Sequence, residues 1–182
     1  MFIGIRDITF AKGRFALICS VIALMSFMVV ALSALTNGLQ GQSISAVTRL
    51  PGEAAVMQEP ADGQSESLAE SSLAPEKVQA IEAGVDGDAA RLGVTTTRLT
   101  VDGASSAAGV FGADSALMPP LDEGSDPGPG EIVLSTEQAE DLHVSVGQTI
   151  EVGPESLRVS GIGDVGSFAH TPAAYTTVET WK

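Results

Sequence analysis

The chain has almost no cysteine. Cys19 is the single one among 182 residues, and it lies inside a long apolar run. The part of the chain that follows this run therefore cannot form an internal disulfide. If that part is exported, its stability has to come from its hydrophobic core.

Basic residues are scarce as well. Nine Lys and Arg stand against 23 Asp and Glu, and three of the nine precede the apolar run with one acid, Asp7. The chain after the run therefore holds six basic and 22 acidic residues, a net charge of −16. Nucleic-acid binding needs clustered Lys and Arg, so that class of function is excluded. The same charge is repelled by an anionic lipid surface and keeps an exposed domain soluble.

The common signatures of catalysis and nucleotide binding are missing. The sequence contains no P-loop, dinucleotide fingerprint, H-E-x-x-H, C-x-x-C or G-x-S-x-G. Without a P-loop this chain does not hydrolyse ATP itself, so any energy has to come from a partner. We predict that it is not an enzyme.

Two local clusters of polar residues invite a functional reading. Asp164, Ser167 and His170 stand close in sequence, but a hydrolase needs Ser against His in space beside an oxyanion hole, so we interpret this segment as a polar loop. The acidic stretches 86–88 and 122–126 do not follow the ligand spacing of an EF-hand. We interpret them as surface acidity and predict no catalytic residue, metal site or cofactor.

The apolar run Phe15–Leu35 contains no charge, Pro, Asn or Gln. As a helix it would be roughly 31 Å long, which matches a hydrocarbon core of about 30 Å. Signal-peptide cores are usually only about 7–15 residues, although Ala31–Ala34 offers a small-residue cleavage pattern. A retained transmembrane helix is therefore the prediction. Basic residues before the run and acidity after it put the N-terminus in the cytoplasm.

Soft side chains and small side chains recur within this run. Cys19, Met25 and Met28 are either ligands for a metal or haem iron or apolar filler facing lipid and other helices. Small residues that would allow partner helices to approach occur at Ala16, Ser20, Ala23, Ser26, Ala31, Ser33 and Ala34.

The first half of the remaining chain predicts a helical stalk over 36–52, which ends at Pro51-Gly52. A strand over 53–58 and an exposed acidic loop over 59–74 follow. Pro75 at a first helical position and Gly84 as a stop predict a short helix over 75–84. Strands over 92–101 and 105–112 flank Asp102-Gly103, a pair that favours a tight hairpin turn.

The second half begins with a Pro- and Gly-rich loop over 118–130. A strand over 132–134 leads into a helix with Ser135 as N-cap and Gln138 completing a capping box. Strands over 148–152 and 157–162 and a final strand precede a second capping box, Thr176 with Glu179. The chain stops at Trp181-Lys182, a pair typical of a membrane boundary, where a second spanning helix would begin.

Several segments resemble FtsX/MacB-type ABC transporter permeases. "MFIGIRDITFAKGRF" is similar to the membrane-surface segment that precedes their first span. "GEIVLSTEQAEDLHVSVGQTIEV" and "LRVSGIGDVGSFAHTPAAYTTVETW" resemble the strand–helix passage and the closing strands of their extracytoplasmic domain. "SLAPEKVQAIEAGVDG" and "TTRLTVDGASSAAGVFG" look most like compact Gram-positive permeases associated with haem or small hydrophobic export.

The resemblance implies an α+β architecture of the MacB-like periplasmic core type after one transmembrane helix. We expect a cytoplasmic membrane-surface segment over 1–14, the span over 15–35, the stalk over 36–52 and an extracytoplasmic α/β domain over 53–182 in the plasma membrane. Such permeases have four transmembrane helices, so this chain would be the N-terminal portion of one.

The resemblance also implies partners. Permeases of this kind work as a homodimer in membrane lipid with cytoplasmic ABC ATPase subunits, and ATP hydrolysis expels a hydrophobic or amphipathic substrate. Within that frame Met25 and Met28 are candidates to face the substrate, possible ligands for haem among others. Arg6, Lys12 and Arg14 are candidates for the cytoplasmic interface, or else anchor the topology.

Two other readings stay open at this stage. The chain could be a complete single-span membrane protein whose acidic outer domain binds a ligand or partner. It could also be a secreted enzyme with a cleaved signal, whose mature N-terminus would lie near Leu35 or Thr36.

Overall fold

The computed structural model describes residues 12–60, 63, 65–85 and 88–182, and Arg6 lies outside these ranges. The chain divides into two compact units, Met1–Gly41 and Gln42–Lys182. Each unit is described by itself.

The described part of the first unit is the long helix α2 (Lys12–Ser43), which ends just after the unit does. Its segment Lys12–Gly38 is long and apolar enough to cross a membrane, and none of it is buried against other parts of the chain. The helix predicted over 15–35 is thus present and longer, because the polar residues after Leu35 continue the same helical hydrogen bonding.

The second unit starts with a short helix, α3 (Ser45–Thr48), so the helical region expected over 36–52 is divided at Ile44. The strand predicted over 53–58 is wrong, because this stretch is exposed and pairs with no strand in the described part of the chain. Instead Gln58 closes a loop: its N–H donates to Ser71 Oγ at 2.9 Å, and its Oε1 accepts from the Ser72 N–H at 3.2 Å.

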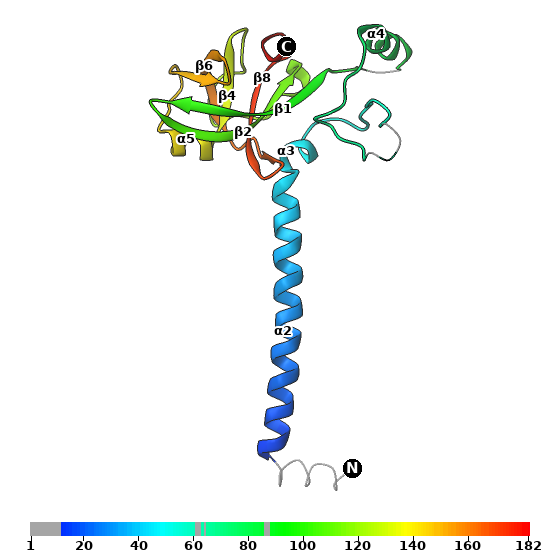
Figure 1. Cartoon of the computed structure of the whole chain (residues 1–182), viewed down its shortest axis with the longest axis vertical. Helices are drawn as coiled ribbons and strands as arrows, with labels where there is room; N and C mark the ends of the chain where they lie inside the picture. Colours follow the sequence, from blue (N-terminus) through cyan, green and yellow to red (C-terminus); the bar gives the residue numbers. More distant parts are fainter. Residues whose placement is uncertain (1–11, 61–62, 64, 86–87) are drawn as a thin grey trace. The chain divides into compact units, whose positions relative to one another are not determined.

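The helix predicted over 75–84 is confirmed as α4 (Pro75–Gly84), with Pro75 in its first turn. None of its residues is buried, and Figure 1 shows it apart from the strands that follow. A helix without a buried face contributes little to the core of the second unit.

The strands form one mixed sheet that closes on itself. Their bounds are β1 (Leu92–Val101), β2 (Ala104–Ala113), β3 (Glu123–Gly124), β4 (Glu131–Ser135), β5 (Thr149–Val152), β6 (Glu155–Gly163), β7 (Ser167–Phe168) and β8 (Thr171–Thr177). The order β2-β1-β5-β6-β4-β8 returns to its start, because β8 also pairs in parallel with β2. These six strands form a small closed barrel (Figure 1). The α+β architecture predicted from the sequence is confirmed.

Local turn chemistry explains the longest hairpin. Asp102 and Gly103 connect β1 to β2 with φ of 48° and 86°, as a two-residue turn with two positive φ angles requires. The predicted hairpin is confirmed, and all ten residues of β1 pair with β2, from Leu92 opposite Ala113 to Val101 opposite Ala104.

The two predicted helix caps have different outcomes. Ser135 and Gln138 form the expected capping box of α5 (Thr136–Leu142). The second cap is wrong by one residue, because Thr177, not Thr176, accepts from the Thr180 N–H at the start of α6 (Val178–Trp181). Thr176 belongs to β8, where its hydroxyl donates to the Glu131 carbonyl at 2.7 Å.

Alternating side chains of the barrel form two hydrophobic cores. The inner core is built from residues such as Leu99, Val110, Ile132 and Ala174, and α5 closes it with Leu142. Their strand neighbours point the other way into an outer core, whose buried members are Ala46, Val94, Phe111, Ala113, Val133, Val165, Ala173 and Tyr175. Since side chains alternate along a strand, one sheet supplies both cores.

The loop predicted over 118–130 contains a short pairing that its Pro and Gly content did not reveal. A turn of 3-10 helix over Ser115–Leu117 precedes it, and β3 pairs antiparallel with β6, Gly124 opposite Gly161. The contact is close: a Cβ on Gly161 would lie 2.9 Å from the Ser125 carbonyl oxygen and 2.7 Å from Leu121 Cδ1. The loop therefore crosses β6 in contact with Gly161, where any larger residue would collide with it. We call this crossing segment, residues 121–125, the strap.

Gly124→Ala tests this strap. Gly124 has φ of +82°, and an added Cβ would overlap the Ser160 carbonyl oxygen. We expect about 1 kcal/mol of backbone strain and a further ~1–3 kcal/mol from the overlap. Gly103→Ala is the matched control, since φ is +86° and nothing lies within 4 Å of the added atom. Urea unfolding followed by circular dichroism measures both, and equal losses would contradict the strap.

Candidate functional site

The helix α2 presents its side chains outward over residues 12–38. Met25 and Met28 are 65% and 64% exposed, and Cys19 is exposed too. The hydroxyl of Ser20 donates to the Ala16 carbonyl at 2.7 Å, and that of Thr36 to the Leu32 carbonyl at 3.0 Å. The helix backbone thus satisfies these polar groups, as a lipid environment requires.

The predicted cationic residues stand at the beginning of α2. Lys12 and Arg14 are both exposed in its first turn. Arg6, the third predicted interface residue, lies outside the described residues. The structure thus leaves the side chains of Lys12 and Arg14 available for a partner or for lipid headgroups.

Directly after α2, the helix α3 is fixed to the barrel. We call this contact the α3 joint; it consists of Ser45, Ala46 and Arg49 on one side and the 164–167 loop with Tyr175 on the other. Ala46 is 1% exposed. The Ser167 N–H donates to Ser45 Oγ at 2.8 Å, and a Cβ on Gly166 would lie 2.8 Å from the Ala46 nitrogen. The backbones approach this closely because Gly166, with φ of +80°, has no side chain.

An ion pair closes the α3 joint at its surface. Arg49 Nη1 lies 2.9 Å from Asp164 Oδ1 and also donates to the Asp164 carbonyl at 2.8 Å. The hydrogen bond and the charge of Arg49 hold the pKa of Asp164 below its ordinary value. Both side chains are well exposed, so the pair contributes at most about 1 kcal/mol.

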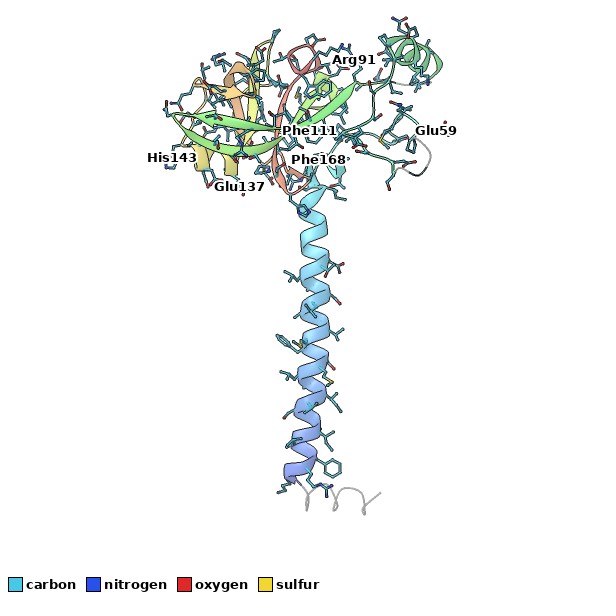
Figure 2. All side chains as sticks on the ribbon, viewed as in Figure 1. Glu59, Arg91, Phe111, Glu137, His143 and Phe168 are labelled. Atoms are coloured by element: carbon cyan, nitrogen blue, oxygen red, sulfur yellow. The ribbon has the colours of Figure 1, made fainter. Side chains whose placement is uncertain are left out.

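Tyr175 is the buried residue of the α3 joint and belongs to the outer core. It is 1% exposed, and its ring stacks on Phe111 with centroids 5.0 Å apart. Phe168 meets Phe111 edge-on at 5.5 Å, and Figure 2 labels both rings. The Tyr175 hydroxyl donates to the Ala46 carbonyl at 3.5 Å, and burial raises the pKa of this phenol to about 12. Strand β8 is thereby connected to α3.

The polar segment Asp164–His170 does not form a triad. The carboxylate of Asp164 is engaged with Arg49, whereas a triad needs it against a histidine. Ser167 and His170 line a hollow of about 180 Å³ together with Glu137 and Pro172. His143 ends α5 in the left-handed conformation, with φ of 55°. Among the described residues, no three His, Cys, Asp or Glu side chains converge as metal ligands.

Trp181 has a position that the sequence did not predict. It packs across Gly93 and Gly112, which are cross-strand partners in β1 and β2, while its place at a membrane boundary stays a prediction. A Cβ on Gly93 would lie 2.7 Å from Cζ3 of the indole, and one on Gly112 would overlap Trp181 Cβ and Cγ. The sequence did contain a sign of this contact, because a glycine inside a strand often marks a place where another group packs directly on the backbone. Gly93 and Gly112 are two such glycines.

The indole packs at the edge of the inner core, but its burial leaves one hydrogen-bond donor unsatisfied. Its Nε1 is buried, with no hydrogen-bond partner in the described part of the chain. An unsatisfied buried donor costs about 1–3 kcal/mol. Burial of an aromatic ring contributes a similar amount, so the net stabilisation is small.

Arg91 is the charged neighbour of this contact. It makes two hydrogen bonds from its guanidinium to Asp114, at 3.1 and 2.9 Å, and lies 3.7 Å from Glu179 of α6. Figure 2 labels Arg91 at this end of the barrel. Arg91 lowers the pKa of Asp114 through these hydrogen bonds, so the carboxylate stays charged well below neutral pH. The base of the β1–β2 hairpin is thereby connected to α6.

In the described chain, one helix that is long and apolar enough to cross a membrane is followed by a small closed barrel, an order that indicates a membrane protein with a folded domain after its first span. The sequence of residues 15–182 matches the model of the MacB-like periplasmic core domain. The chain belongs to this family. No curated protein matches it.

Two of the solved structures that are similar to the chain show what it resembles. The extracellular domain of the noncanonical ABC-type transporter YknZ from Gram-positive bacteria matches 60% of this chain and 65% of its own, with a TM-score of 0.51 and 17% identity. The periplasmic region of MacB from Actinobacillus actinomycetemcomitans matches 57% of this chain and 53% of its own, with a TM-score of 0.45 and 14% identity. The chain thus spans less than two thirds of either relative. The family match supports assignment to FtsX/MacB-type ABC transporter permeases.

Tyr175 is the only tyrosine of the chain, so its ionisation can be followed without interference. We expect the phenolate absorbance to appear with a midpoint of about pH 12 in the folded chain and about pH 10 in denaturant. Because the folded pKa is the higher one, this group stabilises the fold fully below pH 10 and loses that contribution as the pH rises toward 12. A midpoint near 10 under native conditions would contradict the buried position of the ring.

Proposed function

We propose that this chain is the N-terminal part of the permease subunit of an ABC-type export system. In that role it couples ATP hydrolysis by a separate cytoplasmic partner to extrusion of a hydrophobic or amphipathic substrate. The observation that carries the proposal is the family match over 15–182, which includes both the apolar helix and the barrel.

Two properties of the chain agree with a transport role. The helix α2 has no buried face within the described chain, so its apolar side chains are available to lipid and to other spanning helices. The sequence has no P-loop, so the energy has to be supplied in trans. A homodimeric permease with ABC ATPase subunits meets both requirements.

The proposal includes an orientation and the residues that act in it. The N-terminus lies in the cytoplasm, where Arg6, Lys12 and Arg14 contact the ATPase, and the barrel lies outside. Basic residues before α2 and strong acidity after it support this direction. Met25 and Met28 face the substrate, for which haem is one candidate because thioether sulfur can bind its iron.

Affinity purification of the complete gene product from its native membranes in mild detergent tests the function. We expect a P-loop ATPase to co-purify and the complex to hydrolyse ATP in lipid nanodiscs. A matched variant in which Lys12 and Arg14 are replaced by Gln should recover less ATPase at equal expression. An intact single-span protein that purifies without any ATPase would overturn the proposal and favour an acidic ligand-binding domain on a simple anchor.

Replacement of both methionines by leucine tests the substrate contact separately. For Met25→Leu with Met28→Leu we expect haem to bind about tenfold more weakly in nanodiscs, the loss of one modest interaction, at unchanged expression. Val29→Leu, at a neighbouring position that is 64% exposed, is the control. Haem absorbance measures the binding, with empty nanodiscs subtracted. Equal binding by the double variant would exclude the methionines and leave the export function standing.

A further inference from the structure

The hollow at the start of α5 has the lining of a small polar binding site. It has a volume of about 180 Å³ and is lined by Glu137 of α5 and by Ser167, His170 and Pro172 of the β7–β8 hairpin. Such a volume holds several water molecules, and so a small polar group. Three of the four lining residues carry side chains that can accept a hydrogen bond.

The turn that carries His170 has unusual residues for its conformation. The last pair of β7 and β8 is Phe168 with Thr171, so Ala169 and His170 form a two-residue turn, with φ of 50° and 65°. Two positive φ angles are unfavourable for residues with a Cβ, and turns of this kind favour Asn-Gly or Asp-Gly. The β1–β2 hairpin of the same chain has such an Asp-Gly turn. A glycine would fit position 170 with less strain, so the imidazole is what this position supplies.

The backbones on both sides of the hollow are fixed by hydrogen bonds. Gln138, the neighbour of Glu137, is fully buried, and its Nε2 donates to the Pro172 carbonyl at 3.3 Å. This bond joins the first turn of α5 to β8. The Ser167 N–H donates to Ser45 Oγ at 2.8 Å, which joins β7 to α3. The backbones that carry the lining residues are thus held in place before a ligand binds, which favours binding.

Charge and hydrogen-bonding capacity together indicate the kind of ligand. The chain after the apolar run has a net charge of −16, which attracts cations and repels anions. A primary ammonium group has one positive charge, three N–H donors and no acceptor. Glu137, Ser167 and His170 offer a carboxylate, a hydroxyl and a ring nitrogen, one acceptor for each donor. An imidazole has two ring nitrogens, so one can accept while the other is engaged elsewhere.

We propose that this hollow binds a primary ammonium group, with the Glu137 carboxylate as its counter-ion and Ser167 Oγ and the His170 ring as further acceptors. The ammonium belongs either to a small soluble amine or to the ethanolamine headgroup of a lipid, because both present the same three donors. A quaternary ammonium has the charge without an N–H donor, so it binds more weakly. This inference does not depend on the transport function.

Nuclear magnetic resonance of the full chain in an uncharged detergent tests the site. The chain has two histidines, and His143 stands at the other end of α5 as an internal reference. His170→Asn removes one imidazole signal and so assigns it. With ethylammonium as the probe, at a constant alkaline pH, we expect a saturable shift of the His170 signal and none of the His143 signal. Tetramethylammonium should bind at least about tenfold more weakly. Equal, unsaturable shifts of both histidines would overturn the site.

A matched pair of variants on α5 tests the counter-ion. Glu137→Gln removes the carboxylate from the hollow, and we expect ethylammonium to bind about tenfold more weakly, the loss of one charge-assisted hydrogen bond. Glu140→Gln is the control, since Glu140 is exposed on the same helix and does not line the hollow. Circular dichroism checks that both variants keep the barrel. Equal binding by Glu137→Gln and the unmodified chain would contradict the proposal.

Nanodiscs of two compositions identify the source of the ammonium. In discs of phosphatidylcholine alone, ethylammonium should shift the His170 signal as it does in detergent. If a lipid headgroup is the ligand, discs that contain phosphatidylethanolamine give the shifted signal before any amine is added, and ethylammonium has little further effect. If a soluble amine is the ligand, the response is the same in both discs. A His170 signal that responds to neither lipid nor amine would overturn the proposal.

Discussion

The pairing of β2 with β8 is the interaction on which the second unit depends. It joins residues more than sixty positions apart, such as Gly109 with Ala173, and it turns an open sheet into a closed barrel. Closure removes the free edges of both strands, which would otherwise invite pairing with other chains. It also places β8 where one face lines the inner core with Ala174 and the other fills the outer core with Tyr175.

The strand β8 consequently connects two ends of the domain. Through Tyr175 and its contact with the Ala46 carbonyl it supports α3, the first element after the apolar helix. Through Thr177 it starts α6, whose Trp181 returns to the β1–β2 hairpin. The first contact is buried, stacked on Phe111 and fixed by close backbone packing, whereas the second carries an unsatisfied donor. Since Val178 of α6 is itself buried, both contacts are anchored in the core of the domain.

The sequence predicted best what short-range chemistry decides. The helix from Pro75 to Gly84, the Asp102-Gly103 turn and the Ser135 capping box each depend on a few neighbouring residues, and each is present. The prediction from sequence was wrong where two local alternatives were equally favourable and a tertiary contact decided between them. Thr176 and Thr177 are equivalent as caps in isolation, and only the hydrogen bond from Thr176 to the Glu131 carbonyl assigns Thr176 to the strand. The strand expected at 53–58 had suitable residues, but no strand of the described chain pairs with it.

The contacts that could not be predicted are long-range approaches made possible by small residues. Gly166 against Ala46, Gly161 against Leu121 and Gly93 against Trp181 each join segments far apart in the chain, and a glycine alone does not identify what will cover it. The same limit applies to α2. Its length and apolarity predict a spanning helix, but no described residue outside α2 packs on the side that Met25 and Met28 share. A spanning helix derives its orientation from packing against neighbours, so the pattern within the helix alone does not determine what these side chains contact.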